Sequence, residues 1–129
     1  MNHSVAYRIY YEDTDAGGVV YHANYLKFAE RARTEFLRHH NLSNITIREE
    51  KNIIMVVRHI EADYLAPAYL EDLITVETSV PSAKRTSFVM KQTVFRDSIV
   101  LFDMLVTLVC VDTNSFKPVA IPKDIKDVL

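Results

Sequence analysis

The chain has 129 residues, of which 49% are hydrophobic and 25% charged, and this fits one domain, residues 1–129, with a hydrophobic core. Lys and Arg number 15 against 17 Asp and Glu, so a broad basic surface for nucleic acid is excluded. No apolar run approaches a membrane span, the start lacks a signal-peptide core, and the single Cys110 is expected to be a buried thiol, which together predict a soluble cytoplasmic protein.

The first elements are a strand and a long helix. Apolar residues alternate over Val5–Tyr11, which predicts a strand with one apolar face. From Ala23 to His40 the spacing changes to three and four residues, which predicts an amphipathic helix. Its buried stripe should hold Tyr25, Phe28, Ala29, Ala32, Phe36 and Leu37. Asn41, Ser43 and Asn44 should end it, and a short second helix is expected over Ile45–Glu50, with Thr46 and Glu49 as a capping box.

The rest of the chain predicts a sheet. Four segments are rich in β-branched and aromatic residues: Ile53–Leu65, Leu73–Val80, Arg85–Arg96 and Ile99–Val111. Turns are expected at Ala66–Ala68, Pro81–Ser82 and Asp97–Ser98. The last strand is apolar on both faces, so it should lie inside the sheet. Because one helix cannot cover both faces of five strands, we expect an α+β domain that forms a dimer. Residues 122–129 are too few to form a domain.

The segment Glu12–Tyr25, EDTDAGGVVYHANY, carries the most informative chemistry. It places three carboxylates and the pair Gly17-Gly18 immediately before the long helix. Glycine lets the backbone turn tightly and lets a ligand approach main-chain N–H groups. The helix start offers unpaired donors and a partial positive charge. A carbonyl oxygen that becomes negative during nucleophilic attack is suited to such a position.

Three segments together carry a resemblance to a known family: YYEDTDAGGVVYHANYLKFAERARTEFL, DYLAPAYLEDLITVET and VCVDTNSFKPVAIPKDI. They resemble the hotdog-fold acyl-CoA thioesterases of the 4-hydroxybenzoyl-CoA thioesterase family, most closely the bacterial branch associated with the Tol-Pal envelope system. The resemblance implies a five-stranded antiparallel sheet wrapped around one long central helix. It also implies a homodimer or homotetramer that hydrolyses short to medium acyl-CoA, or acyl carrier protein thioesters, at subunit interfaces without a cofactor.

The resemblance also assigns roles to residues. Asp15 matches the catalytic aspartate of the pattern D-x-D-x-x-G, acting as nucleophile or as general base. The backbone amide of His22 matches the donor that polarises the thioester carbonyl. The positions expected to contact substrate in this segment are Gly18, Val20, Tyr21 and Tyr25. Because coenzyme A carries phosphates, Arg58 with His59 and Lys84 with Arg85 are further candidates, although exposed cations are usually only solvated.

Other interpretations compete with these roles. Asp13 and Asp15 could be turn residues that only satisfy backbone donors. A calcium loop starting at Asp13 fails, because its twelfth position is Asn24 and not a bidentate Glu, and no metal is expected. A dehydratase would need a placed His–carboxylate pair, and only His22 lies near the turn. A scaffold that binds acyl thioesters or acyl carrier protein without turnover remains the alternative to an enzyme.

Overall fold

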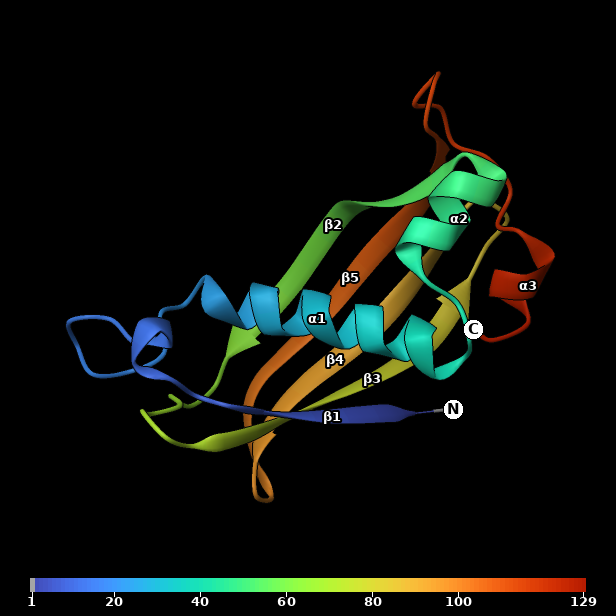
Figure 1. The fold of residues 1–129 in the computed structure, drawn as a ribbon. Helices are drawn as coiled ribbons and strands as arrows, with labels where there is room; N and C mark the ends of the chain where they lie inside the picture. The colour runs from blue at the N-terminus through green and yellow to red at the C-terminus, as the bar shows by residue number, and fades with distance from the viewer. Residues whose placement is uncertain (1) are drawn as a thin grey trace.

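The computed structural model describes residues 2–129, which form one five-stranded antiparallel sheet with helices on one side (Figure 1). The strand order is β1-β3-β4-β5-β2, so β1 and β2 are the edges. The strands are β1 (His3–Arg8), β2 (Ile53–Tyr64), β3 (Leu73–Ala83), β4 (Ser87–Arg96) and β5 (Ile99–Asp112). The helices are η1 (Tyr11–Asp13, 3-10), α1 (Asn24–His39), α2 (Asn44–Lys51) and α3 (Lys123–Lys126).

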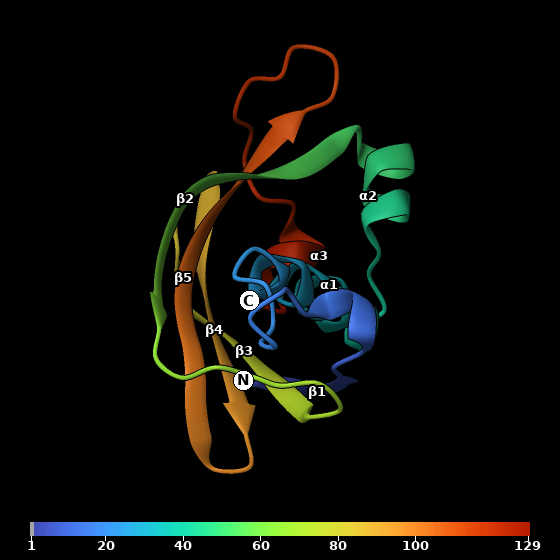
Figure 2. The same cartoon turned by 90° about the vertical axis from the view of Figure 1, so that its left-hand side faces the viewer.

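Helix α1 lies in the curve of the sheet, and Figure 2 shows the strands bending around it. Its buried side chains are the six predicted from the sequence: Tyr25, Phe28, Ala29, Ala32, Phe36 and Leu37. Ala29 and Ala32 have no exposed surface, because a methyl group is all that fits where the helix approaches the sheet. The predicted long central helix and antiparallel sheet are therefore confirmed.

In the short connection between α1 and α2, the predicted end of α1 is confirmed and the predicted cap of α2 is wrong. Asn41 takes a left-handed conformation, with φ of 61°, and ends α1 as expected. The cap of α2 is Ser43, whose hydroxyl oxygen accepts a hydrogen bond from the Thr46 N–H at 3.1 Å. The predicted capping box of Thr46 and Glu49 is therefore wrong, since Thr46 already lies inside the helix.

The C-terminal ends of two predicted strands are wrong by three residues each. Strand β1 ends at Arg8, and Tyr11 belongs to the 3-10 turn η1, where its side chain is exposed. Pro81 and Ser82 do not form a turn but lie in β3, at a register shift between Ser79 and Ser82. Proline is tolerated there because a bulge interrupts the ladder. The chain reverses after Ala83.

The middle strand of the sheet is β4, and β5 lies inside between β4 and β2, as its apolar pattern predicts. The edge strand β2 exposes several apolar side chains, including Val57 and Ile60. An exposed apolar edge is a feature that proteins normally cover.

None of the helices in residues 2–129 combines the length and the apolar character needed to cross a membrane.

Candidate functional site

The segment between β1 and α1 folds as a tight hairpin-like turn. Thr14 and Val20 form an antiparallel bridge. Inside it, the Asp15 N–H donates to the carbonyl oxygen of Val19 at 2.9 Å, and the Gly18 N–H donates to that of Asp15 at 3.0 Å. Gly18 has φ of 80°, a conformation that a side chain would strain. The turn therefore has a defined backbone that fixes where Asp15 lies.

The Asp15 carboxylate is exposed and only partly used by the turn. Its Oδ1 accepts a hydrogen bond from the Gly17 N–H at 2.8 Å, whereas Oδ2 has no partner in the described part of the chain. A Cβ at Gly17 would lie 3.1 Å from Oδ1, so glycine leaves room for this bond. Asp15 lines a shallow hollow of ≈ 560 Å³ together with Tyr11, Thr14, Ala16, Gly18 and Leu70. One carboxylate oxygen is free to act on a ligand there.

Asp13 holds the segment through one carboxylate oxygen and through its main chain. Its Oδ2 accepts from the Tyr10 N–H at 2.8 Å. Its carbonyl oxygen accepts from the Tyr21 N–H at 3.0 Å and from the Asn24 side chain at 2.9 Å. The turn interpretation of Asp13 is confirmed. Within residues 2–129, no group of three or more His, Cys, Asp or Glu side chains is arranged to hold a metal ion.

The start of α1 leaves backbone donors free. Its N-cap is Ala23, which has no side chain that could accept from the first turn. Among the described residues, the N–H of His22 has no acceptor, while its carbonyl oxygen accepts from the Tyr64 hydroxyl at 2.8 Å. The His22 ring is exposed and lies 4.5 Å from the Tyr21 ring. The main chain of His22 thus presents a donor at the positive end of the helix.

A small apolar hollow adjoins this helix start. It measures ≈ 290 Å³ and is lined by Val19, Val20, Tyr25, Tyr64, Leu65, Ala66 and Pro67. Val20 and Tyr25 are buried, and the Tyr25 hydroxyl accepts from the Ala68 N–H at 3.1 Å. Of the residues predicted to contact substrate, the hollow brings together Val20 and Tyr25. Gly18 lies instead in the hollow of Asp15, and Tyr21 is 45% exposed beside His22.

The sequence analysis did not identify Tyr64, which hydrogen-bonds to the start of α1 and lines the small apolar hollow. Tyr64 lies in DYLAP, the beginning of one of the three segments that resemble the thioesterases, and that resemblance was the one indication of its importance. The sequence did not indicate what Tyr64 contacts, because its hydrogen-bond partner lies 42 residues away along the chain.

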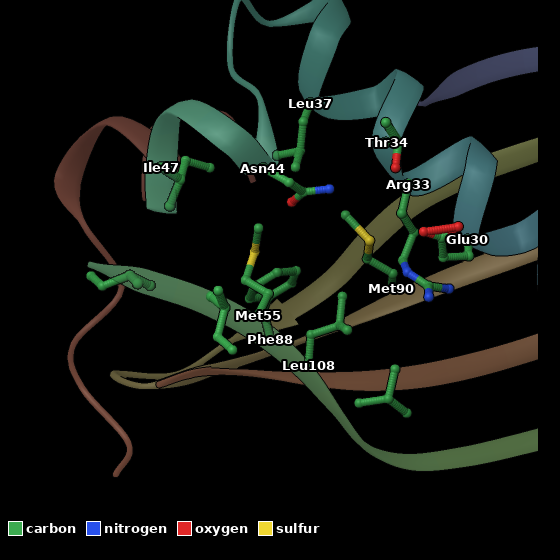
Figure 3. Close-up of a pocket in the computed structure, with 13 residues that line it drawn as sticks. Glu30, Arg33, Thr34, Leu37, Asn44, Ile47, Met55, Phe88, Met90 and Leu108 are labelled. Carbon is green, nitrogen blue, oxygen red and sulfur yellow. The ribbon is translucent and has the colours of Figure 1, made fainter. Parts of the chain in front are cut away.

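A third hollow, a pocket of ≈ 310 Å³, lies between the C-terminal half of α1, α2 and β2 (Figure 3). Its floor is apolar and includes Met55, Phe88 and Leu108. Arg33 lines it and donates to the Gln92 Oε1 at 3.0 Å. Burial lowers the pKa of Arg33, and in residues 2–129 no carboxylate lies within 4.0 Å of its guanidinium. The sequence analysis did not identify this pocket.

None of the four candidate cations lines the hollow of Asp15. Arg58 and His59 lie exposed on β2, where the register shifts, and His59 faces Glu61 at 3.1 Å. Lys84 and Arg85 lie between β3 and β4, at the end of β3 remote from the turn (Figure 1). Since β3 has 11 residues, that separation is on the order of 35 Å. Within one chain, Lys84 and Arg85 therefore lie too far from Asp15 to share a site with it.

Comparison with known proteins finds a matching family, a similar sequence and a similar structure. The family model described as thioesterase-like superfamily matches residues 10–129. An acyl-CoA thioesterase, YbgC of Haemophilus influenzae, is 48% identical over 119 residues, covering 92% of this chain and 88% of that protein. The crystal structure of a probable thioesterase from Bartonella henselae is 34% identical, with a TM-score of 0.90, covering 95% of this chain and 100% of that one.

A more distant structure supports the fold alone. A 4-hydroxybenzoyl-CoA thioesterase superposes with a TM-score of 0.92 at 19% identity, covering 98% of this chain and 97% of that chain. The strand order, the helix in the curve of the sheet and this superposition agree on the hotdog architecture. Because the family model spans nearly the whole sequence, the chain belongs to the thioesterase-like superfamily, with the hotdog fold.

Proposed function

We propose that this protein is an acyl-CoA thioesterase that hydrolyses short to medium acyl thioesters, with Asp15 as its catalytic carboxylate. One observation carries the proposal: a carboxylate with one unpaired oxygen lies on the turn whose other end is the unpaired His22 N–H. The names of the similar proteins support the reaction class. The hollow of ≈ 290 Å³ beside Val20 and Tyr25 suits a modest acyl group.

The chemistry needs few groups. Asp15 either attacks the carbonyl carbon to form a mixed anhydride that water then hydrolyses, or removes a proton from the water that attacks. In both routes the C–S bond breaks, the thiolate leaves and takes up a proton, and the acid is released. The His22 N–H donates to the carbonyl oxygen as negative charge develops on it. Loss of one such donor typically costs about 3 kcal/mol of transition-state stabilisation.

The active assembly in this proposal is a homodimer, which could pair further into a tetramer. The exposed apolar edge β2 supports it, because antiparallel pairing of two β2 strands would cover that edge. Such pairing about a point near Arg58 places the Ile53 end of one strand beside the Tyr64 end of the other. The pocket lined by Arg33 in one chain would then open toward the helix start of its partner, and Arg58 and His59 would lie near the shared boundary.

The test is turnover by Asp15→Asn across a series of acyl-CoA and acyl carrier protein thioesters. Asparagine keeps the Oδ1 acceptor for the Gly17 N–H, so the fold should persist. We expect thiol release to fall by about 10²–10⁴-fold. Wild-type rates in this variant would refute the catalytic assignment of Asp15. Hydrolysis of none of the thioesters by the wild type would favour the binding scaffold over the enzyme.

His22→Ala provides the matched comparison, because it removes the imidazole but keeps the main-chain donor. We expect it to lose much less activity than Asp15→Asn. An equal loss in a folded protein would favour imidazole chemistry and the dehydratase alternative. The acyl series also decides chain length and the choice between coenzyme A and acyl carrier protein. Cytoplasmic location and the Tol-Pal association stay predictions.

A further inference from the structure

Among residues 2–129, one side chain from outside the turn hydrogen-bonds to the residues at the start of α1. Tyr64, the last residue of β2, donates its hydroxyl to the His22 carbonyl oxygen at 2.8 Å. Ala23, the N-cap, contributes no side-chain hydrogen bond. A helix start without a capping side chain depends on other contacts to fix its first peptide groups. The Tyr64 hydroxyl makes such a contact.

The Tyr64 ring is itself held in place by aromatic neighbours. It packs edge-on against Tyr25, with ring centroids 5.5 Å apart, and against Phe102 at 4.9 Å. Phe102 is its cross-strand partner on β5, and Tyr25 lies in the first turn of α1. Both neighbours are buried, so the hydroxyl is aimed by rigid elements although the ring is 51% exposed. Burial raises the pKa of Tyr64, which keeps the phenol protonated as a donor.

The two peptide groups that flank His22 are therefore each held by a hydrogen bond. The Tyr21 carbonyl oxygen accepts from the Asn24 N–H at 2.9 Å, and this restrains the plane that carries the His22 N–H, which can still turn about the bonds of the His22 Cα unless the next plane is held too. The next plane, which carries the His22 carbonyl, is fixed by Tyr64. With both planes held, the His22 N–H points in one direction before a substrate arrives.

We propose that Tyr64 is a positioning residue for thioester hydrolysis, which acts through His22 by presetting the direction of its N–H toward the carbonyl oxygen of the substrate. The inference rests on the proposed site of Asp15 and His22. A preorganised donor stabilises the transition state without reorganisation during reaction, so a loosened donor lowers the rate more than it weakens binding.

The test is Tyr64→Phe, which removes only the hydroxyl and keeps the ring between Tyr25 and Phe102. We expect kcat to fall by about tenfold, with KM and the melting temperature little changed. A thioether analogue of the acyl-CoA, which has no carbonyl, should bind the variant as tightly as the wild type. The matched control is Tyr69→Phe, whose ring lies over Arg96 and whose hydroxyl makes no hydrogen bond in residues 2–129, and it should keep the wild-type kcat.

Measurements on the protein without substrate complete the test. The NMR order parameter of the His22 N–H should fall in Tyr64→Phe and stay unchanged in Tyr69→Phe. An unchanged kcat, or a rise in KM alone, would overturn the role of Tyr64. Asp15→Asn measured in parallel separates the two proposals. If it is inactive while Tyr64→Phe is fully active, only the positioning role fails; if it is active, the site itself is wrong.

Discussion

Replacement of Gln92 on β4 should destabilise the fold through groups left without partners. The Gln92 side chain has no exposed surface and links helix to sheet. Its Nε2 donates to the Ala29 carbonyl oxygen at 2.8 Å and to the Thr78 hydroxyl oxygen at 3.1 Å, and its Oε1 accepts from Arg33 at 3.0 Å. Gln92→Leu has similar volume but leaves the buried Thr78 hydroxyl and the Arg33 guanidinium short of a partner. At about 1–3 kcal/mol for each, the expected loss is on the order of 3 kcal/mol.

The assay is urea unfolding at one fixed protein concentration, since an oligomer gains apparent stability with concentration. Arg33→Met in the Gln92→Leu background removes the orphaned cation, so the double variant should be more stable than the sum of the two single losses. We expect a coupling energy of about 1–3 kcal/mol. Thr93→Val, on the opposite face of β4 with one hydrogen bond to Asp103, is the control and should lose under about 1 kcal/mol. Additive losses within about 0.5 kcal/mol would refute the network.

Two further predictions concern ionisation. Burial raises the pKa of Cys110 to about 11, so iodoacetamide at pH 8 should leave the native thiol unmodified by mass spectrometry, and labelling as fast as in the urea-unfolded chain would contradict this. Burial and the neighbouring His39 lower the folded-state pKa of His3 and His40, so the unfolded chain binds more protons and the free energy of unfolding should fall as the pH drops through about 6.5. Urea midpoints at pH 7.5 and 5.5 measure this, and the difference should shrink in a His3→Gln/His40→Gln variant; an unchanged difference would exclude these residues as its source.

The long helix could be predicted from the sequence because its cause is local. Apolar residues three and four positions apart form one stripe on any α-helix, whatever lies against it. The residues from Tyr25 to Leu37 on that stripe are those that the sheet buries. The strands were likewise found from alternation, since side chains of one face recur every second residue.

The predictions are wrong at positions where the local sequence fits two conformations and a distant strand or a neighbouring residue decides which one forms. Pro81 is typical of a turn, and only the register with β4 makes it part of a bulged strand. Ser43 and Thr46 are both suitable caps. Because Asn41 has already reversed the chain, Ser43 takes the extended conformation that a cap requires, and the helix starts at Asn44.

The same distinction applies to the site. Asp15, Gly18 and His22 could be identified from one segment, because a turn and the helix that follows it are contiguous. The contacts of Tyr64 and Arg33 could not, because their partners lie 42 and 59 residues away. Sequence reasoning therefore found the groups proposed to react, while the groups that hold or surround them needed the fold.

Each of the two aspartates of the turn holds one backbone N–H with its side chain. The Asp13 side chain meets one backbone donor, the Tyr10 N–H; the bonds from the Tyr21 N–H and from the Asn24 side chain go to its main-chain carbonyl oxygen, which any residue at position 13 would keep. The Asp15 side chain also meets one backbone donor, the Gly17 N–H, and an asparagine oxygen would serve it equally. The structure thus needs an acceptor at position 15 but not a negative charge. Because an exposed charge without an ion-pair partner contributes little to stability, the negative charge of Asp15 is not needed for folding, which agrees with the catalytic role proposed for it.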